Sequence, residues 1–109
     1  MREIPHEQFT ARYAEGAELI DVREPYEYVA GHVPGARLMP MSQLTQHTHE
    51  LPLDAPVYVI CASGNRSLAV AAFLAGAGVD AWSVAGGTGA WIRAGRPLAY
   101  GTQSSVDRD

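Results

Sequence analysis

The sequence predicts an α/β domain in three layers, with helices on both faces of a central, mainly parallel five-stranded sheet. Short apolar segments alternate along the chain with segments of helical periodicity, which is typical of doubly wound folds. Apolar runs such as residues 57–60 are continuous rather than alternating, as expected for strands that are buried on both sides. The 109 residues have room for one hydrophobic core, so a single domain is expected.

The periodicity also places the individual elements. Five strands are expected, at residues 2–4, 17–22, 37–40, 57–60 and 81–84. Helices are expected between and after them, at residues 5–15, 25–30, 41–48, 68–75 and 90–94. Pro5 suits the first positions of the first helix and Gly16 ends it, while Gly76 and Gly78 stop the long helix that follows residue 67.

The same patterns predict which helical side chains face the core. The expected inward residues are Tyr26 with Val29 or Ala30 in the second helix, Met41 with Leu44 in the third, and Leu68, Ala71 or Ala72, and Leu74 or Ala75 in the fourth. Trp91 is expected in the core as well.

Composition excludes several classes of function. The formal net charge is −4, which argues against a nucleic-acid or anionic-membrane partner. All eight basic residues are arginine, so lysine Schiff-base chemistry is excluded. A single cysteine rules out an internal disulfide and a cysteine-cluster metal site, and a free thiol suits a reducing compartment. The chain has no apolar run long enough to span a bilayer and no apolar signal core, so we expect a cytoplasmic, soluble protein.

Two further motifs resemble parts of ligand-binding sites but lack the other residues that such sites need. His47 and His49 have no cysteine or carboxylate pattern around them, so no metal is expected. The glycines at residues 86–89 resemble a phosphate loop, but they lack the lysine of a P-loop and the spacing of a dinucleotide fingerprint. No cofactor is therefore expected.

Residues 57–67 carry the clearest chemical signal. The apolar strand at residues 57–60 leads into Cys61, then into a short loop of small and polar residues, and then into an Ala- and Leu-rich helix. Unpartnered backbone N–H groups at such a helix start form an anion-binding nest. A free cysteine titrates near ~8.5, and helix N-termini lower this to roughly 3.5–7.5. Arg66 adds a permanent cation, so the pattern favours a reactive Cys61 thiolate over a merely buried cysteine.

The loop at residues 61–67 resembles the active-site loop of rhodanese-like sulfurtransferase domains. Three other stretches match the same family in the same order: residues 21–24, residues 31–36, and Gly86-Gly87 followed by Ala90-Trp91 and residues 95–97. The resemblance runs from about Ile4 to Leu98. It implies a rhodanese-like domain over residues 1–99, and we expect residues 100–109 to form a flexible tail.

The resemblance implies a sulfurtransferase that works through a persulfide on Cys61. Thiosulfate or a persulfide would be the donor, and a thiol or cyanide the acceptor, with a sulfur-relay protein as a further candidate partner. The sulfur would be cradled by Ala62, Ser63, Gly64, Asn65, Arg66 and Ser67. Asp21 and Arg23 would have supporting roles, against the simpler reading of a surface salt bridge. His32 is expected to be fixed in a turn rather than to act as a base.

Alternatives remain open at this point. Many rhodanese-like domains are non-catalytic binding or regulatory modules, and a passive persulfide carrier would share the Cys61 chemistry. Cysteine phosphatases use a similar nest, but their loop between cysteine and arginine is one residue longer than the four residues here. Ala62 stands where many members of the family carry a basic residue, so a modest affinity for thiosulfate is expected.

Overall fold

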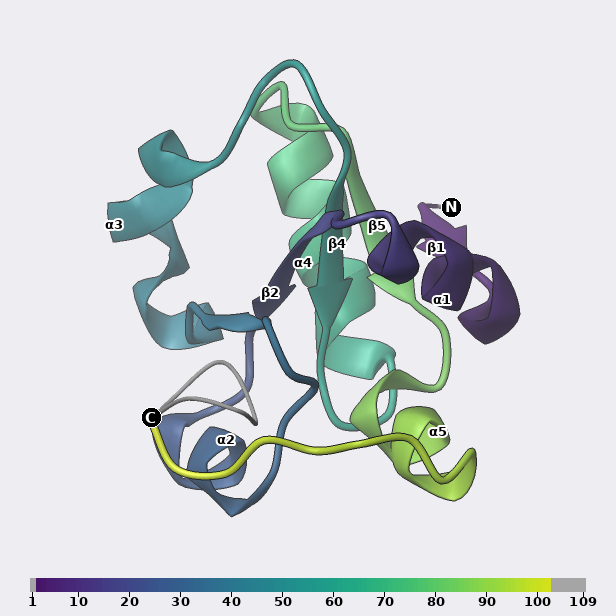
Figure 1. Cartoon of the computed structure of the whole chain (residues 1–109). Coiled ribbons are helices and arrows are strands. Elements are labelled where there is room, and N and C mark those ends of the chain that lie inside the picture. Colours follow the sequence, from purple (N-terminus) through teal and green to yellow (C-terminus); the bar gives the residue numbers. More distant parts are fainter. Residues whose placement is uncertain (1, 103–109) are drawn as a thin grey trace.

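A computed structural model of the chain describes residues 2–102 (Figure 1). Its centre is a single sheet of five strands in the order β1-β5-β4-β2-β3, and every neighbouring pair is parallel. The strands are β1 (Glu3–Ile4), β2 (Glu18–Asp21), β3 (Arg37–Leu38), β4 (Val57–Ile60) and β5 (Ala81–Val84). The predicted sheet is thus confirmed, with β4 at its middle.

Helices cover both faces of this sheet. They are α1 (His6–Ala14), α2 (Pro25–Ala30), α3 (Leu44–His47), α4 (Asn65–Gly76) and α5 (Gly87–Arg93), with short 3-10 turns at Met41–Gln43 and Thr48–Glu50. One apolar cluster joins α4 and Leu44 of α3 to the sheet, and a second cluster joins Phe9 of α1, Tyr28 of α2 and Trp91 of α5. The three-layer arrangement follows from these two cores.

Strand β4 shows how the sequence divides its side chains between the two cores. Val57 and Val59 pack in the cluster on the α4 side, whereas Tyr58 and Ile60 pack in the cluster on the α1 side. Successive side chains of a strand point to opposite faces, so Cys61 continues the first set and lies on the α4 side. In Figure 1 the strands β2 and β4 run toward the end of the molecule where α2 and α5 lie.

Two predicted inward faces are wrong. In α2 the buried residue is Tyr28, at 3% exposure, whereas Tyr26 is 77% exposed and Val29 is also exposed. Tyr28 is fixed because its hydroxyl donates to the carbonyl of Ala36 at 2.6 Å. Met41, at 42% exposure, begins a 3-10 turn rather than an α-helix, and only Leu44 of that pair is buried.

The helices α4 and α5 begin three residues earlier than predicted, at Asn65 and Gly87. In α4 the residues packed against the sheet are Val70, Ala71 and Leu74, with Ser67 buried in the first turn. Leu68 is only partly buried and Ala72 is exposed, contrary to the expectation for Leu68. The early start matters because it brings Ser67 and Thr88 into helix N-termini.

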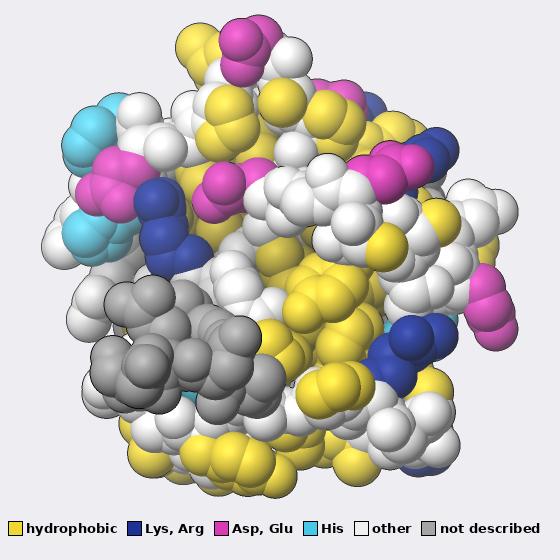
Figure 2. All heavy atoms as spheres, viewed as in Figure 1, with side chains coloured by type: hydrophobic (Ala, Val, Ile, Leu, Met, Phe, Trp, Pro, Cys, Tyr) yellow, Lys and Arg dark blue, Asp and Glu magenta, His cyan; other side chains and the backbone are white. Residues whose placement is uncertain are grey.

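The C-terminal segment is described as far as Thr102. There Gly101 donates its backbone N–H to the carbonyl of Val29 at 2.9 Å. The rest of the predicted tail, residues 103–109, lies outside the described residues. Within residues 2–102, no helix has the length and apolar character needed to cross a bilayer. On the face shown in Figure 2, basic side chains are scattered among acidic and apolar ones.

Candidate active site

Cys61 directly follows the last residue of β4 and is fully buried. Its sulfur accepts hydrogen bonds from the backbone N–H groups of Gly64, at 3.1 Å, and Ser67, at 3.3 Å. The hydroxyl oxygen of Ser67 also lies 3.3 Å from the sulfur. The loop after Cys61 therefore turns back, so that the backbone N–H groups at the start of α4 point toward the Cys61 sulfur.

Gly64 makes this turn possible. It is the N-cap of α4 and has a φ of 105°, a left-handed conformation that side chains disfavour. Asn65, which could also have taken a positive φ, is helical instead. A Cβ on Gly64 would in addition lie 3.3 Å from the backbone nitrogen of Gly86. A glycine is therefore required at the N-cap for both reasons.

Two effects on the Cys61 thiol oppose each other. Burial raises its pKa, because a charged sulfur loses hydration. Hydrogen bonds from the hydroxyl and amide of Ser67 and from the amides of Gly64 and Ser63 favour the thiolate. The hydrogen bonds prevail, so the pKa of Cys61 is lowered from its ordinary value. The local structure thus favours the thiolate form of Cys61.

The start of α5 holds the loop from its other side. The carbonyl oxygens of Cys61 and Ala62 accept hydrogen bonds from the backbone N–H groups of Thr88, at 2.8 Å, and Gly89, at 3.0 Å. This approach is so close that a Cβ on Gly87 would stand 2.4 Å from the carbonyl oxygen of Cys61. The glycine pair noted in the sequence therefore serves backbone packing beside the loop.

Arg66 is tied to α2 by a residue that the sequence did not reveal. Its two terminal nitrogens each lie 2.9 Å from one carboxylate oxygen of Glu27. This bidentate pair lowers the pKa of Glu27 to about 2. Glu27 also accepts a hydrogen bond from the backbone N–H of Glu24 in a capping box. A Glu-x-x-Glu spacing at a helix start could have indicated the capping box, but it could not have indicated that Glu27 pairs with Arg66 of α4.

Asp21 and Arg23 form a second ion pair, and it is buried rather than on the surface. The closest nitrogen–oxygen distance is 2.7 Å, with side-chain exposures of 0% and 7%. Arg23 also donates to the carbonyl of Gly31 at 2.9 Å, which ties the end of β2 to the predicted turn at residues 31–36. Val22, between the two, donates its N–H to the carbonyl of Ile60, one residue before the cysteine.

His32 lies in that turn and is fully buried. Its Nδ1 lies 2.7 Å from the carbonyl oxygen of Tyr28, and its ring stacks on the Tyr28 ring with centroids 3.6 Å apart. Backbone hydrogen bonds in both directions link it to Ala99. These contacts are those of a structural histidine, as predicted.

The arginines around the loop differ in whether a carboxylate neutralises them. Arg23 and Arg66 each have a carboxylate partner. Arg93 of α5, among residues 2–102, makes no salt bridge. Its Nη1 lies 3.2 Å from the point where a Gly89 Cβ would stand, and that point is 3.3 Å from the carbonyl oxygen of Ala62. Because residue 89 has no side chain, the uncompensated guanidinium lies back along α5 toward the loop.

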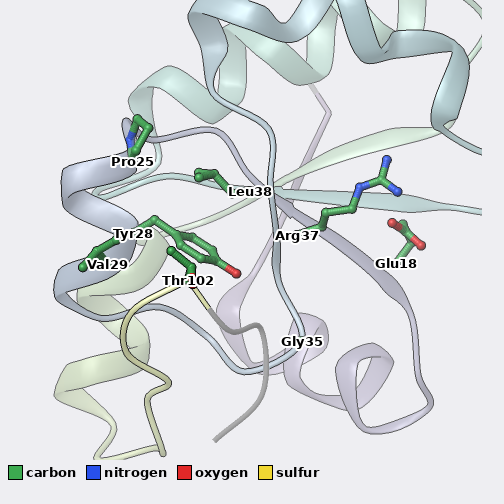
Figure 3. Close-up of a pocket in the computed structure, with 8 residues that line it drawn as sticks. All are labelled: Glu18, Pro25, Tyr28, Val29, Gly35, Arg37, Leu38 and Thr102. Atoms are coloured by element: carbon green, nitrogen blue, oxygen red, sulfur yellow. The ribbon is translucent and has the colours of Figure 1, made fainter. Parts of the chain in front are cut away.

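Histidines and carboxylates elsewhere in the chain make contacts of their own. Within the described part of the chain, no three His, Cys, Asp or Glu residues are grouped so as to hold a metal ion. His47 instead contacts Glu50 at 2.7 Å. A cleft of about 490 Å³ lies away from Cys61, and Figure 3 shows the side chains that line it. Its lining consists of Glu18, Pro25, Tyr28, Val29, Gly35, Arg37, Leu38 and Thr102.

Comparisons with known proteins agree with this architecture. The family model of the rhodanese-like domain matches residues 6–94. A protein of Pseudomonas putida strain F1 named thiosulfate sulfurtransferase GlpE is 40% identical over 92 residues, covering 83% of this chain and 84% of that protein. A protein of Bacillus subtilis named uncharacterized protein YqhL is 48% identical over 67 residues, which is 62% of this chain and 52% of that one.

Solved structures show the same likeness. A rhodanese-related protein from Thermoplasma volcanium superposes with a TM-score of 0.83 at 33% identity, covering 91% of this chain and 98% of the other. A rhodanese-like domain protein from Staphylococcus aureus gives 0.82 at 30% identity, with 92% and 98% covered. The chain therefore belongs to the family of rhodanese-like domains.

Proposed function

We propose that the protein is a sulfurtransferase that carries a sulfane sulfur on Cys61 as a persulfide. The observation that carries the proposal is the pair of hydrogen bonds that the Cys61 sulfur accepts from the backbone N–H groups of Gly64 and Ser67 at the start of α4. These donors stabilise negative charge on sulfur, which is the nucleophile of the first step and the leaving group of the second. Several Pseudomonas relatives bear the name thiosulfate sulfurtransferase, which supports the same reaction class.

The reaction has two half-reactions. The Cys61 thiolate attacks the outer sulfur of the donor, and the donor's sulfur–sulfur bond breaks. With thiosulfate, sulfite leaves with the bonding electron pair, and the terminal sulfur of the new persulfide carries the negative charge. A thiol, cyanide or a relay protein then attacks that terminal sulfur, and Cys61 leaves as the thiolate. The electrons balance without a cofactor, and no dedicated base is needed once the thiol is ionised.

A cysteine phosphatase is less well supported. Such an enzyme needs an arginine free to bind two phosphate oxygens, and here both terminal nitrogens of Arg66 are occupied by Glu27. Only Ala62, Ser63, Gly64 and Asn65 separate Cys61 from Arg66, and the sulfur is fully buried. A short loop around a buried sulfur suits a single transferred atom better than a tetrahedral anion.

The donor is defined only as a class. Thiosulfate is a dianion, and Ala62 offers it no positive charge, while Arg93 is a nearby cation that makes no salt bridge within residues 2–102. We therefore propose a modest affinity for thiosulfate that depends on Arg93, with a small persulfide or a protein persulfide as the alternative donor. A thiol, cyanide or a relay protein is the proposed acceptor.

The decisive test is an intact-protein mass spectrum after brief incubation with thiosulfate, beside a Cys61→Ser control. A gain of one sulfur atom on the wild type alone supports the persulfide intermediate, and its loss on adding cyanide or a thiol supports turnover. A stable gain without turnover indicates a passive carrier that needs its partner protein. The absence of any gain with thiosulfate and persulfide donors would contradict the proposal and favour a binding module.

A further inference from the structure

Ser83 is a buried polar residue that the packing of the sheet does not explain. It lies in β5, fully buried, in register with Val59 of β4 and Glu3 of β1. Strand interiors favour β-branched and aromatic side chains, and a buried hydroxyl is destabilising unless it is hydrogen-bonded. A serine at this position indicates that the hydroxyl itself is needed.

The alternation of β5 directs Ser83 toward the reactive sulfur. Ala81, two residues earlier, belongs to the same apolar cluster as Cys61. Because side chains two residues apart in a strand lie on the same face, the Ser83 side chain lies on the face of the sheet that α4 covers. There its hydroxyl oxygen lies 2.7 Å from that of Ser67, which is also fully buried. The oxygen of Ser67 lies 3.3 Å from the Cys61 sulfur. The three side chains form a continuous chain from β5 through α4 to Cys61.

Proton counting fixes the direction of this chain. A hydroxyl has one proton to donate, and an ionised sulfur can only accept. When Cys61 is a thiolate, Ser67 must donate its proton to the sulfur. The short contact between the serines can then be a hydrogen bond only if Ser83 donates to Ser67. A donated bond strengthens the donor power of the hydroxyl that receives it. When Cys61 is a thiol, the chain can reverse.

We propose that Ser83 is a positioning residue, which holds the Ser67 hydroxyl with its proton toward Cys61 and so stabilises negative charge on the sulfur. In the free protein this favours the thiolate. In the second half-reaction, which rests on the proposed sulfur transfer, it favours departure of Cys61 as a thiolate. Ser83 does not touch the sulfur in the contacts described and acts through Ser67 alone.

Charged groups at the same end of the sheet do not substitute for this chain. Arg66 of α4 has an electrostatic interaction with Cys61, but Glu27 of α2 neutralises its charge. The charges at the end of β2 belong to the buried pair of Asp21 and Arg23. On the α5 side the nearest charge is Arg93, which lies beside the carbonyl of Ala62 rather than among the donors to the sulfur. The two serine hydroxyls are therefore the side-chain groups whose hydrogen bonds can favour negative charge on the Cys61 sulfur.

The test is a pH titration of the thiolate by its ultraviolet absorbance, which does not require a reagent to reach the buried sulfur. Cys61→Ser supplies the blank, because Cys61 is the single cysteine. We expect Ser83→Ala to raise the apparent pKa of Cys61 by about half a unit, a change of about threefold in the thiolate-to-thiol ratio. Ser67→Ala should raise it further, and Ser67→Ala with Ser83→Ala should equal Ser67→Ala alone.

A matched pair of variants separates the hydroxyl from the packing. Ser83→Thr and Ser83→Val have the same shape, and only threonine retains the hydroxyl, so threonine should keep the wild-type titration and valine should shift it. Ser42→Ala, at an exposed serine, controls for the substitution itself. The proposal is overturned if valine and threonine titrate alike, or if Ser83→Ala still shifts the titration in the Ser67→Ala background. The titration is read without sulfur transfer, so its failure is distinct from a failure to form the persulfide.

Discussion

The helices α4 and α5 begin in the same way and do different things. Each follows a glycine in the left-handed conformation, Gly64 with φ 105° and Gly86 with φ 79°, and neither has a side-chain cap. In α4 the uncapped amides of Gly64 and Ser67 bind the Cys61 sulfur. In α5 the amides of Thr88 and Gly89, in the first turn, bind backbone carbonyls of the loop.

The difference lies in what each set of amides faces. Orphan N–H groups at a helix start need an acceptor, and either a thiolate or a carbonyl will serve. Because α5 binds the carbonyl oxygens of Cys61 and Ala62, those carbonyls are held away while the loop's amides turn to the sulfur. A helix start after a left-handed glycine thus binds the cysteine sulfur in one case and holds the loop around it in the other.

The largest effect should come from disturbing the support. Gly87→Ala places a Cβ 2.4 Å from the carbonyl oxygen of Cys61 at a residue with φ 58°. We expect the free energy of unfolding to fall by about 3 kcal/mol, measured by urea denaturation. Gly95→Ala is the matched control, since it has φ 73° but nothing within 4 Å of its Cβ. It should lose only about 1 kcal/mol, and an equal loss would show that conformation rather than contact explains Gly87.

Gly64→Ala should act on chemistry more than on stability. Its φ of 105° strains any side chain, and its Cβ would stand 3.3 Å from the Gly86 nitrogen. Relief of that strain moves the Gly64 amide from the sulfur, so we expect persulfide formation to slow about tenfold. The unfolding free energy should fall by about 1–2 kcal/mol. Stopped-flow or quenched mass spectra give the rate, and an unchanged rate would separate this amide from the reaction.

The ion pair between Glu27 of α2 and Arg66 of α4 should make the free energy of unfolding depend on pH. The pKa of Glu27 is lowered to about 2, so the pair contributes stability above the unfolded-state pKa, and the contribution is lost as pH falls toward 2. Wild type should exceed Glu27→Gln by about 1 kcal/mol at neutral pH, and the gap should close in acid. Denaturation curves of both proteins across this range provide the measurement. A gap that is constant with pH would contradict the ionic account.

The smallest effect concerns attraction of the donor. Arg93→Ala should raise the Michaelis constant for thiosulfate by about threefold, and Ala62→Arg should lower it by a similar factor. Both changes should shrink as ionic strength rises, because exposed charges are screened. Steady-state cyanide assays at two salt concentrations would measure this. If Ala62→Arg leaves the constant unchanged, the missing cation does not limit thiosulfate binding.

The sequence predicted best what is local in the chain. Cys61, the loop after it and the central strand are consecutive residues, so their pattern could be read directly. Glu27 and Ser83 could not be found, because their roles depend on partners 39 and 16 residues away that only the fold brings close. The α2 helix is too short for periodicity to choose between Tyr26 and Tyr28, and the choice is made by the Tyr28 hydroxyl bond to Ala36.

The alternation along β4 fixes which face of the sheet Cys61 lies on. Val57, Val59 and Cys61 share one core cluster, and Tyr58 and Ile60 share the other. Inserting or deleting one residue before Cys61 would turn its sulfur to the face of α1 and away from the amides of α4. The loop after Cys61 is constrained differently, because its length decides whether the amides of Gly64 and Ser67 reach the sulfur. A change of one residue in the length of the chain before Cys61 would therefore separate the sulfur from its hydrogen-bond donors even if the loop itself were unchanged.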